Sequence, residues 1–364
     1  MIHFAIGTKA QFIKMAPIMH LLQNEGLQYH LLDLSQHASL TGKILDDFNL
    51  SPRITKFMEL RDSITTYKQA LIWFANGIYQ SLKDRNTIRK KFFLDQSGVV
   101  LVHGDTLSTV LGYKLAKAGG IPVALVEAGL TSNNLFNPFP EELVRRYVSK
   151  KSQYLFPPGI ECVNWLQSKN YKAIIINTLY NTGRDSMNLV LLKNSKSPPV
   201  ENTKGIATLH RLETLSNSDR LRKIINYIIE FSTNTNGLDF YLHPPTEHAL
   251  KKFNLLRILE KCSYINIKGL EPYPLFVNSL MSAKYILTDG GSIQEEAFYL
   301  GKPCIILRDT TERNEGLGHN AFISSWSAVN DSIKLSNLAI PYMKFQYPEF
   351  HASKIIIESL LNYK

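Results

Sequence analysis

The chain has 364 residues, of which 44% are hydrophobic and 20% charged, as is usual for globular proteins. It is longer than one hydrophobic core usually serves, so two domains are expected. The formal net charge of +10 favours phosphorylated or polyanionic partners. Lysines and arginines are nevertheless spread along the sequence, which argues against a nucleic-acid groove.

Three cysteines, Cys162, Cys262 and Cys304, lie far apart without a CxxC pair. This spacing argues against both a zinc site and a disulfide framework, so no metal is expected and a reducing cytoplasm is the simplest setting. No apolar run approaches the roughly 20 residues that a membrane helix needs. The first residues read directly as a core strand, and we expect no targeting segment and no integral membrane segment.

Short apolar runs, each followed by a turn and a longer helical stretch, predict parallel strands with crossover helices. In the first half the expected strands are 2–7, 99–103, 123–127, 154–156 and 173–176, with helices starting near Gln11, Leu107, Glu141 and Gly159. The segment 63–93 is expected to hold one or two helices. A polar stretch rich in Pro, Ser and Asn, 193–204, predicts a surface loop just past a domain junction.

The alternation of strands and helices then restarts. The expected strands are 205–209, 240–243, 264–267, 285–288 and 304–307, and the expected helices are 219–231, 274–282, 292–300 and an amphipathic tail helix, 352–361. Two doubly wound sheets bind ligands at the carboxyl ends of their strands. We therefore predict an α/β protein with two Rossmann-like domains and a ligand cleft between them.

Polar residues follow several of these strands. Asp105 and Glu127 end two strands of the first half, as acid/base chemistry in a cleft requires, although a helix N-cap and a structural ion pair explain them equally well. Glu141 begins a helix, where a first-turn role is the simpler interpretation. Lys9 and Lys14 follow the first strand, and lysines at such positions usually lie on a solvent-exposed helix face.

In the second half, His210 and Arg211 follow the strand that opens the domain, and Arg211 could neutralise a phosphate. The turn Gly290, Gly291, Ser292 runs into a helix whose amino terminus suits a pyrophosphate. Glu296, one helical turn on, could accept hydrogen bonds from ribose hydroxyls. A plain glycine-rich turn is the alternative interpretation.

Together these residues resemble the UDP-N-acetylglucosamine 2-epimerase family over nearly the whole chain. The segments that carry the resemblance are HGDTLST (103–109), VEAGL (126–130), PEE (140–142), LTDGGSIQEEA (287–297), GKP (301–303) and RDTTERNE (308–315). The sequence departs from the family pattern at the opening GTRPE, which reads GTKAQ, and at the DSGG turn, which reads DGGS. It also has Thr131 where an arginine is usual.

The resemblance implies a glycosyltransferase-B-like architecture without metal or nicotinamide. The implied domains are 1–182, which would hold the sugar and receive the tail helix 350–364, and 183–349, which would grip UDP. The implied catalytic residues are Asp105, Glu127, Glu141 and His210. The implied substrate-binding residues are Lys9, Lys14, His37, Arg145, Arg211, His243, Phe276, Gly290, Gly291, Ser292, Glu296 and Arg313.

The implied reaction is inversion at sugar carbon 2 by elimination and re-addition of UDP, in the service of surface polysaccharide synthesis, by a cytoplasmic homodimer. A hydrolysing relative that releases N-acetylmannosamine and UDP is an alternative. A glycosyltransferase of the same fold, or a sugar-nucleotide sensor without turnover, are further alternatives. A modified or uronic-acid form of the sugar also stays open.

Overall fold

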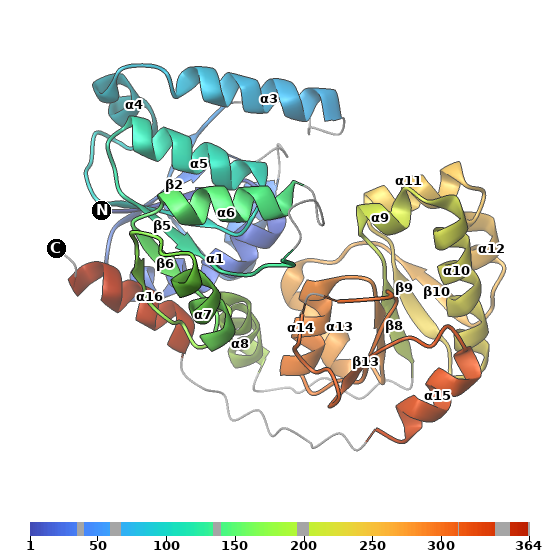
Figure 1. The fold of residues 1–364 in the computed structure, drawn as a ribbon. Coiled ribbons are helices and arrows are strands. Elements are labelled where there is room, and N and C mark those ends of the chain that lie inside the picture. The colour runs from blue at the N-terminus through green and yellow to red at the C-terminus, as the bar shows by residue number, and fades with distance from the viewer. Residues whose placement is uncertain are drawn as a thin grey trace. The chain divides into compact units, whose positions relative to one another are not determined.

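A computed structural model describes residues 1–34, 40–58, 67–133, 140–194, 204–311, 313–338 and 350–362 (Figure 1). The chain divides into two compact units. Unit 1 comprises Met1–Leu189 and Pro348–Lys364, and unit 2 comprises Val190–Tyr347. The expected boundary at 182 and 183 falls at the first turn of helix α8 (Thr182–Asn194), within which the chain passes from unit 1 to unit 2.

Unit 1 contains a parallel sheet in the order β3-β2-β1-β4-β5-β6-β7. Its strands are β1 (Ile2–Ile6), β2 (Tyr29–Asp33), β3 (Arg53–Lys56), β4 (Val99–His103), β5 (Val123–Val126), β6 (Tyr154–Phe156) and β7 (Ile174–Ile175). The five strands predicted from the first half are present, whereas β2 and β3 were not predicted. β3 is mostly exposed and polar, so its sequence carries no apolar run.

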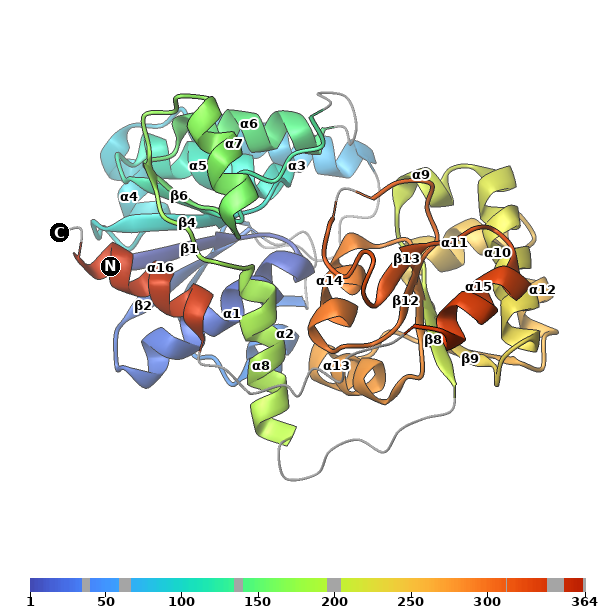
Figure 2. The same cartoon turned by 60° about the horizontal axis from the view of Figure 1, so that its bottom comes forward.

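Helices cover both faces of this sheet, as the two views of Figures 1 and 2 show. On one face α1 (Lys9–Asn24) packs against α2 (Leu40–Phe48) and the tail helix α16 (His351–Asn362). On the other face lie α3 (Tyr67–Gln80), α4 (Arg85–Phe92), α5 (Leu107–Ala118) and α6 (Glu141–Lys151). Helix α7 (Ile160–Ser168) joins β6 to β7, and segment 63–93 holds two helices, α3 and α4.

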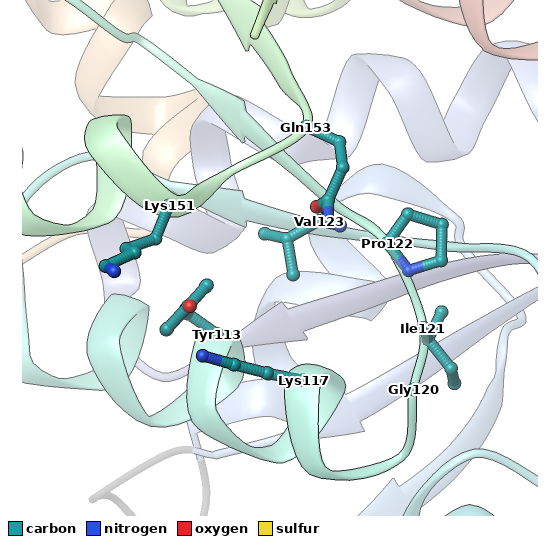
Figure 3. A pocket seen from close by; sticks show the side chains of 8 residues that line it. All are labelled: Tyr113, Lys117, Gly120, Ile121, Pro122, Val123, Lys151 and Gln153. Atoms are coloured by element: carbon teal, nitrogen blue, oxygen red, sulfur yellow. Dashed lines mark hydrogen bonds between the residues drawn. The ribbon is translucent and has the colours of Figure 1, made fainter. Parts of the chain in front are cut away.

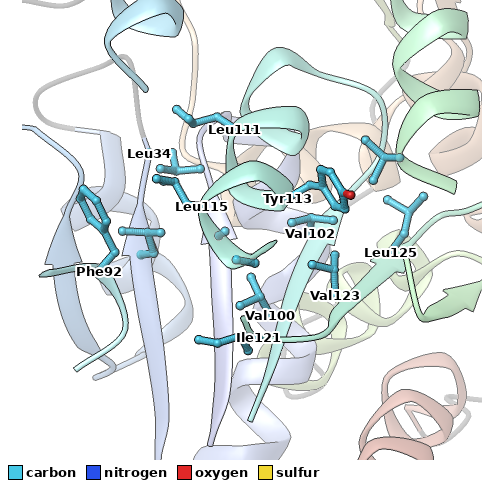
Figure 4. Close-up of a cluster of buried hydrophobic side chains, with 14 of the residues drawn as sticks. Leu34, Phe92, Val100, Val102, Leu111, Tyr113, Leu115, Ile121, Val123 and Leu125 are labelled. Carbon is cyan, nitrogen blue, oxygen red and sulfur yellow. The ribbon is translucent and has the colours of Figure 1, made fainter. Parts of the chain in front are cut away.

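The core of unit 1 lies between the sheet and helices α3 to α6. Figure 4 shows Val100 and Val102 of β4 and Val123 of β5 facing Leu111 and Leu115 of α5. These side chains are essentially buried, and burying each one contributes about 2 kcal/mol. This core fixes the ends of β4 and β5, and therefore the polar residues that follow them.

Unit 2 contains a second parallel sheet in the order β10-β9-β8-β11-β12-β13. Its strands are β8 (Gly205–Thr208), β9 (Leu238–Tyr241), β10 (Ile265–Lys268), β11 (Ile286–Thr288), β12 (Cys304–Ile306) and β13 (Ala321–Ile323). Five of them match the predicted strands within two residues. The sixth, β13, was not predicted because three residues are too short for a periodic signal.

One face of the second sheet is covered by α9 (Leu212–Leu215), α10 (Ser218–Thr233), α11 (Pro244–Lys252), α12 (Leu256–Glu260) and α15 (Ala328–Ser336). Helices α13 (Tyr273–Ser282) and α14 (Gly291–Tyr299) pack on the other face. The predicted class of two doubly wound α/β domains is confirmed. In the part of the chain that the structure describes, no helix has both the length and the apolar composition needed to cross a membrane.

Candidate active site

Each sheet has one place where the strand order reverses. In unit 1 the strands that follow β1 in the sequence, β2 and β3, lie on one side of it, and the strands that follow β4 lie on the other side. In unit 2 the order reverses in the same way between β8 and β11. Ligands of doubly wound sheets bind beyond the carboxyl ends of such strands. The residues after β1, β4, β8 and β11 include many of the side chains predicted to act on the substrate.

Glu127 is held at the end of β5 in an unusual backbone conformation. Its φ of 62° lies in the left-handed region, which costs a residue other than glycine about 1 kcal/mol or more. Both carboxylate oxygens lie 2.9 Å from the Lys14 ammonium, and Oε1 accepts a 2.6 Å hydrogen bond from Asn181 Nδ2. His103 Nε2 lies 3.1 Å from Oε2. The ammonium of Lys14 and the amide of Asn181 orient the carboxylate and stabilise its charge.

Lys14 is therefore not on a solvated helix face, because its side chain is only 10% exposed. The prediction that it belongs to the site depended on the resemblance alone, and the structure places it against a predicted catalytic carboxylate. Lys9, the first residue of α1, is half-buried. His37 lies outside the described residues.

Asp105 follows β4 and forms an ion pair with Arg145 of α6, with 2.5 Å between Oδ2 and Nη2. Thr106, rather than Asp105, occupies the N-cap position of α5, which removes the capping explanation for Asp105. Arg145 also lies 3.5 Å from the carboxylate of Glu142, a fully buried residue. Glu142 also accepts hydrogen bonds from Arg146 and from Thr131, so it links α6 to the loop that follows β5.

Glu141, the first residue of α6, has a different environment. Its Oε2 atom is buried and has no hydrogen-bond partner among the described residues. A buried polar atom without a partner costs about 1–3 kcal/mol, so such atoms mark places where a ligand or water completes the site. Glu141 is a catalytic candidate of unit 1 with a buried oxygen that no described residue contacts.

Gln11 ties the ends of β1 and β4 together and was noticed in the sequence only as a departure from the family pattern. Its Oε1 accepts from the backbone N–H of Gly7 at 2.9 Å, and its Nε2 donates to the His103 carbonyl at 2.7 Å and to Thr109 Oγ1 at 2.9 Å. An amide can accept on one side and donate on the other, whereas a carboxylate can only accept. Glutamine therefore matches the partners present at this position.

In unit 2, the turn after β8 is organised by Asp289, which the sequence did not single out. This fully buried carboxylate accepts hydrogen bonds from the backbone N–H groups of His210 at 3.0 Å and Arg211 at 3.2 Å. Partial burial lowers the pKa of His210, and the Asp289 carboxylate opposes that shift. The imidazole is consequently more easily kept neutral at pH 7, as a general base requires.

Gly290 lies directly against the histidine. A Cβ atom at this position would lie 2.1 Å from His210 Cε1, a distance that no real contact allows. Gly290 is also the N-cap residue of α14, so Gly291 and Ser292 contribute the first N–H groups of this helix. Such a helix start is suited to bind a phosphate. His243 stacks obliquely near His210, with 5.5 Å between the ring centroids.

The remaining predicted residues of unit 2 have defined partners. Glu296 Oε1 accepts a 3.1 Å hydrogen bond from the hydroxyl of buried Tyr273, and burial together with this carboxylate raises the pKa of Tyr273 well above its usual value. Arg313 forms a 2.9 Å ion pair with the buried carboxylate of Glu295, and Arg211 forms a 2.8 Å pair with Glu213. Phe276 contacts Tyr241 edge to face at 5.1 Å.

Most of the predicted residues fall into two groups, one in each unit, which we call half-site 1 and half-site 2. Half-site 1 consists of Lys14, Asp105, Glu127, Glu141 and Arg145, and half-site 2 consists of His210, His243, Gly290, Gly291, Ser292 and Glu296. In the described chain, no cluster of three or more His, Cys, Asp or Glu side chains could hold a metal ion. Two doubly wound domains with charged side chains at their switch points define the class of nucleotide-handling α/β proteins.

Residues 20–337 match the sequence profile of the family described as UDP-N-acetylglucosamine 2-epimerase. A protein of that name from Methanocaldococcus jannaschii is 33% identical over 323 residues, which cover 85% of this chain and 84% of that protein. The chain therefore belongs to the UDP-N-acetylglucosamine 2-epimerase family, a family of enzymes, as the resemblance predicted.

Solved structures agree with this assignment. The crystal structure of M. jannaschii UDP-GlcNAc 2-epimerase in complex with UDP-GlcNAc and UDP matches with a TM-score of 0.82 at 27% identity, covering 99% of each chain. The enzyme from Neisseria meningitidis bound to UDP-GlcNAc matches with a TM-score of 0.80 at 28% identity, again over 99% of each chain. These matches support the predicted fold class over the whole length.

Proposed function

We propose that this enzyme interconverts UDP-N-acetylglucosamine and UDP-N-acetylmannosamine by inverting sugar carbon 2. The family membership and the two related structures that hold UDP-GlcNAc support this substrate. Unit 1 would hold the sugar and unit 2 the UDP. The two half-sites suit these tasks, because one is rich in carboxylates and the other presents a helix amino terminus.

The proposed reaction begins with removal of the proton from carbon 2 and departure of UDP from carbon 1, which leaves 2-acetamidoglucal. UDP then returns to carbon 1 while a proton reaches carbon 2 from the other face. No carbonyl acidifies this carbon, so stabilising the departing diphosphate must lower the barrier. The first N–H groups of α14, at Gly291 and Ser292, and the side chain of Arg313 are the proposed diphosphate ligands.

The contacts in half-site 1 suggest different duties for its carboxylates. Glu127 is surrounded by Lys14, His103 and Asn181, which favour its charged form and make it a weak proton acceptor. We therefore assign Glu127 to electrostatic stabilisation and sugar positioning. Asp105 pairs with Arg145 through Oδ2 only and its side chain is 24% exposed, so it is held less tightly than Glu127. Asp105 and Glu141, which has a buried oxygen with no described partner, are the proposed proton-transfer groups for the two faces of the sugar.

The buried oxygen of Glu141 is the observation that carries this proposal, since a carboxylate without a partner is poised to exchange a proton. The test is proton NMR of UDP-N-acetylglucosamine with the protein in deuterated water. Deuterium should enter at carbon 2 and UDP-N-acetylmannosamine should accumulate. If no candidate UDP-sugar gains deuterium at carbon 2, epimerisation is excluded and a sugar-nucleotide sensor becomes the better assignment.

The same spectra separate the other activities. Free N-acetylmannosamine with UDP would identify a hydrolysing epimerase. Transfer of the sugar to an added acceptor without deuterium at carbon 2 would identify a glycosyltransferase. A modified UDP-sugar that exchanges faster than UDP-N-acetylglucosamine would redefine the substrate while leaving the chemistry in place.

The proposed setting is a cytoplasmic homodimer that supplies the manno sugar for surface polysaccharide and binds no nucleic acid. Helix α3 supports self-association, because Leu71, Ile72 and Tyr79 expose about half or more of their surface to solvent. Light scattering should give twice the chain mass for the native protein and the single mass for the Ile72→Lys/Tyr79→Lys variant. A native protein with the single chain mass would contradict the dimer.

A further inference from the structure

A pocket lies in unit 1, at the end of the sheet opposite half-site 1. It has a volume of about 460 Å³ and is lined by eight described residues, Tyr113, Lys117, Gly120, Ile121, Pro122, Val123, Lys151 and Gln153 (Figure 3). Val123 begins β5 and Glu127 follows its last residue, so about 13 Å of extended chain separates the pocket from the candidate catalytic carboxylate. The pocket is therefore distinct from the proposed active site.

The polar side chains of this pocket can donate hydrogen bonds, and none of them is acidic. Lys117 is the second-to-last residue of α5, and Lys151 is the last residue of α6. Neither ammonium group forms an ion pair with any described residue. Gln153 accepts a 2.8 Å hydrogen bond from the Val123 N–H with its Oε1, which leaves its Nε2 as the donor. A concave surface that presents ammonium and amide donors selects anions.

Tyr113 adds a third donor beside the two lysines. Its side chain is fixed edge to face against Tyr147, and the residue is only 3% exposed. Its hydroxyl forms no hydrogen bond with any residue that the structure describes. Figure 3 shows this oxygen on the same side of the pocket as the ammonium groups of Lys117 and Lys151. Burial raises the pKa of Tyr113, so the hydroxyl remains a donor at neutral pH.

The two lysines also end helices, where lysine commonly compensates the negative helix terminus. In α5 the N–H groups of Gly119 and Gly120 bind the carbonyls of Leu115 and Lys117, so this helix end has backbone donors of its own. In α6 the N–H of Ser152 binds the carbonyl of Val148, three residues before the last. Both lysines line the pocket, where their ammonium groups can reach a bound anion.

We propose that this pocket binds the phosphate group of a small phosphorylated metabolite. The ammonium groups of Lys117 and Lys151 and the hydroxyl of Tyr113 contact the phosphate oxygens. Ile121, Pro122 and Val123 provide an apolar wall for the organic part. The volume falls in the range of small-molecule sites and is far larger than a bare phosphate ion needs.

The experiment introduces 3-fluorotyrosine at position 113 of the full chain and follows its ¹⁹F resonance during titration with ribose 5-phosphate at pH 7. The resonance should shift and saturate, because the phosphate contacts the labelled ring. Ribose, which lacks the phosphate, and sodium chloride at matched ionic strength should not reproduce the curve. This readout does not depend on epimerase activity, so it remains valid if the proposed function fails.

Two double variants with the same charge change separate binding from general electrostatics. Lys117→Gln/Lys151→Gln should weaken the apparent affinity about tenfold or more, because charge-assisted hydrogen bonds are lost. Lys150→Gln/Lys172→Gln alters two exposed lysines outside the pocket and should leave the affinity unchanged. A shift that sodium chloride reproduces, or equal affinities for both variants, would overturn the proposal and leave the lysines as solubilising charges.

Discussion

The two half-sites are constructed in different ways. Half-site 1 is a set of side chains from distant parts of unit 1, joined by ion pairs such as Lys14 with Glu127 and Asp105 with Arg145. Half-site 2 depends mainly on backbone groups, because Asp289 accepts two backbone N–H groups and Gly290 leaves room for His210. Charge should therefore control half-site 1, whereas the volume and backbone geometry of small residues should control half-site 2.

The largest effect is expected for Glu141→Gln in half-site 1. The amide is nearly isosteric but cannot accept the proton, so kcat should fall about a thousandfold with little change in unfolding temperature. Glu25→Gln, at an exposed helix end in the same unit, is the matched control and should keep full activity. A Glu141→Gln enzyme with native kcat would remove this residue from proton transfer.

Lys14→Met tests whether charge pairing stabilises half-site 1. The substitution keeps the apolar stem but leaves the buried Glu127 carboxylate without its cation, and the free energy of unfolding should fall by about 3 kcal/mol. Adding Glu127→Gln to Lys14→Met should recover much of this loss in denaturant titrations. If the double variant is as unstable as the sum of the single variants, the pair does not stabilise the fold as a unit.

Gly290→Ala tests whether volume controls half-site 2. The methyl carbon would lie 2.1 Å from His210 Cε1, so the imidazole must move, and such a displacement should lower kcat about a hundredfold. Gly269→Ala adds the same methyl group in open space within unit 2 and serves as the control. Equal activity of the two variants would show that the position of His210 does not limit the reaction.

Asp289→Asn should have a smaller effect in the same half-site. One of the two backbone N–H groups would face the amide nitrogen, which loosens the His210 turn and should lower kcat about tenfold. The loss should vanish when His210 is already alanine, since Asp289 acts through the histidine. Additive losses in the two backgrounds would instead assign Asp289 to the general stability of unit 2.

The last prediction concerns the pH dependence of stability and lies outside both half-sites. His3 and His30 are fully buried with 3.0 Å between their Nδ1 atoms, and burial lowers their pKa values to about 3 and about 4. The folded state keeps both neutral, while the unfolded chain takes up protons below pH 6.5. Stability should therefore fall as the pH drops from 6.5 towards 4.

The expected slope is about 1.4 kcal/mol per pH unit for each histidine in this window. Denaturant titrations between pH 4 and pH 8 measure it. The variant His3→Gln/His30→Gln should show a markedly shallower dependence because glutamine does not titrate. An unchanged slope would mean that other groups dominate the acid sensitivity.

Much of the fold follows from local sequence. The runs at 99–103 and 123–126 are apolar, short and followed by polar residues, and the structure places β4 and β5 there. Of the strands that were missed, β3 is mostly exposed and β13 is very short, so no periodic apolar signal marks them. β2 is buried throughout, but its only continuous apolar pair is Leu31 and Leu32, between His30 and Asp33. Helices were predicted best where their apolar face repeats over several turns, as in α10.

The sequence by itself determined the family, most of the strands and helices, and the polar residues that follow the strands, because these depend on motifs and patterns of neighbouring residues. Only the tertiary structure decided the partners. Lys14 contacts Glu127, which lies 113 positions further along the chain, and the Asp289 carboxylate accepts a hydrogen bond from the backbone N–H of His210. Glu141 has an oxygen that no described residue contacts. Such contacts arise when packing of the sheet and helices brings distant segments together, and no local pattern records which side chains will meet.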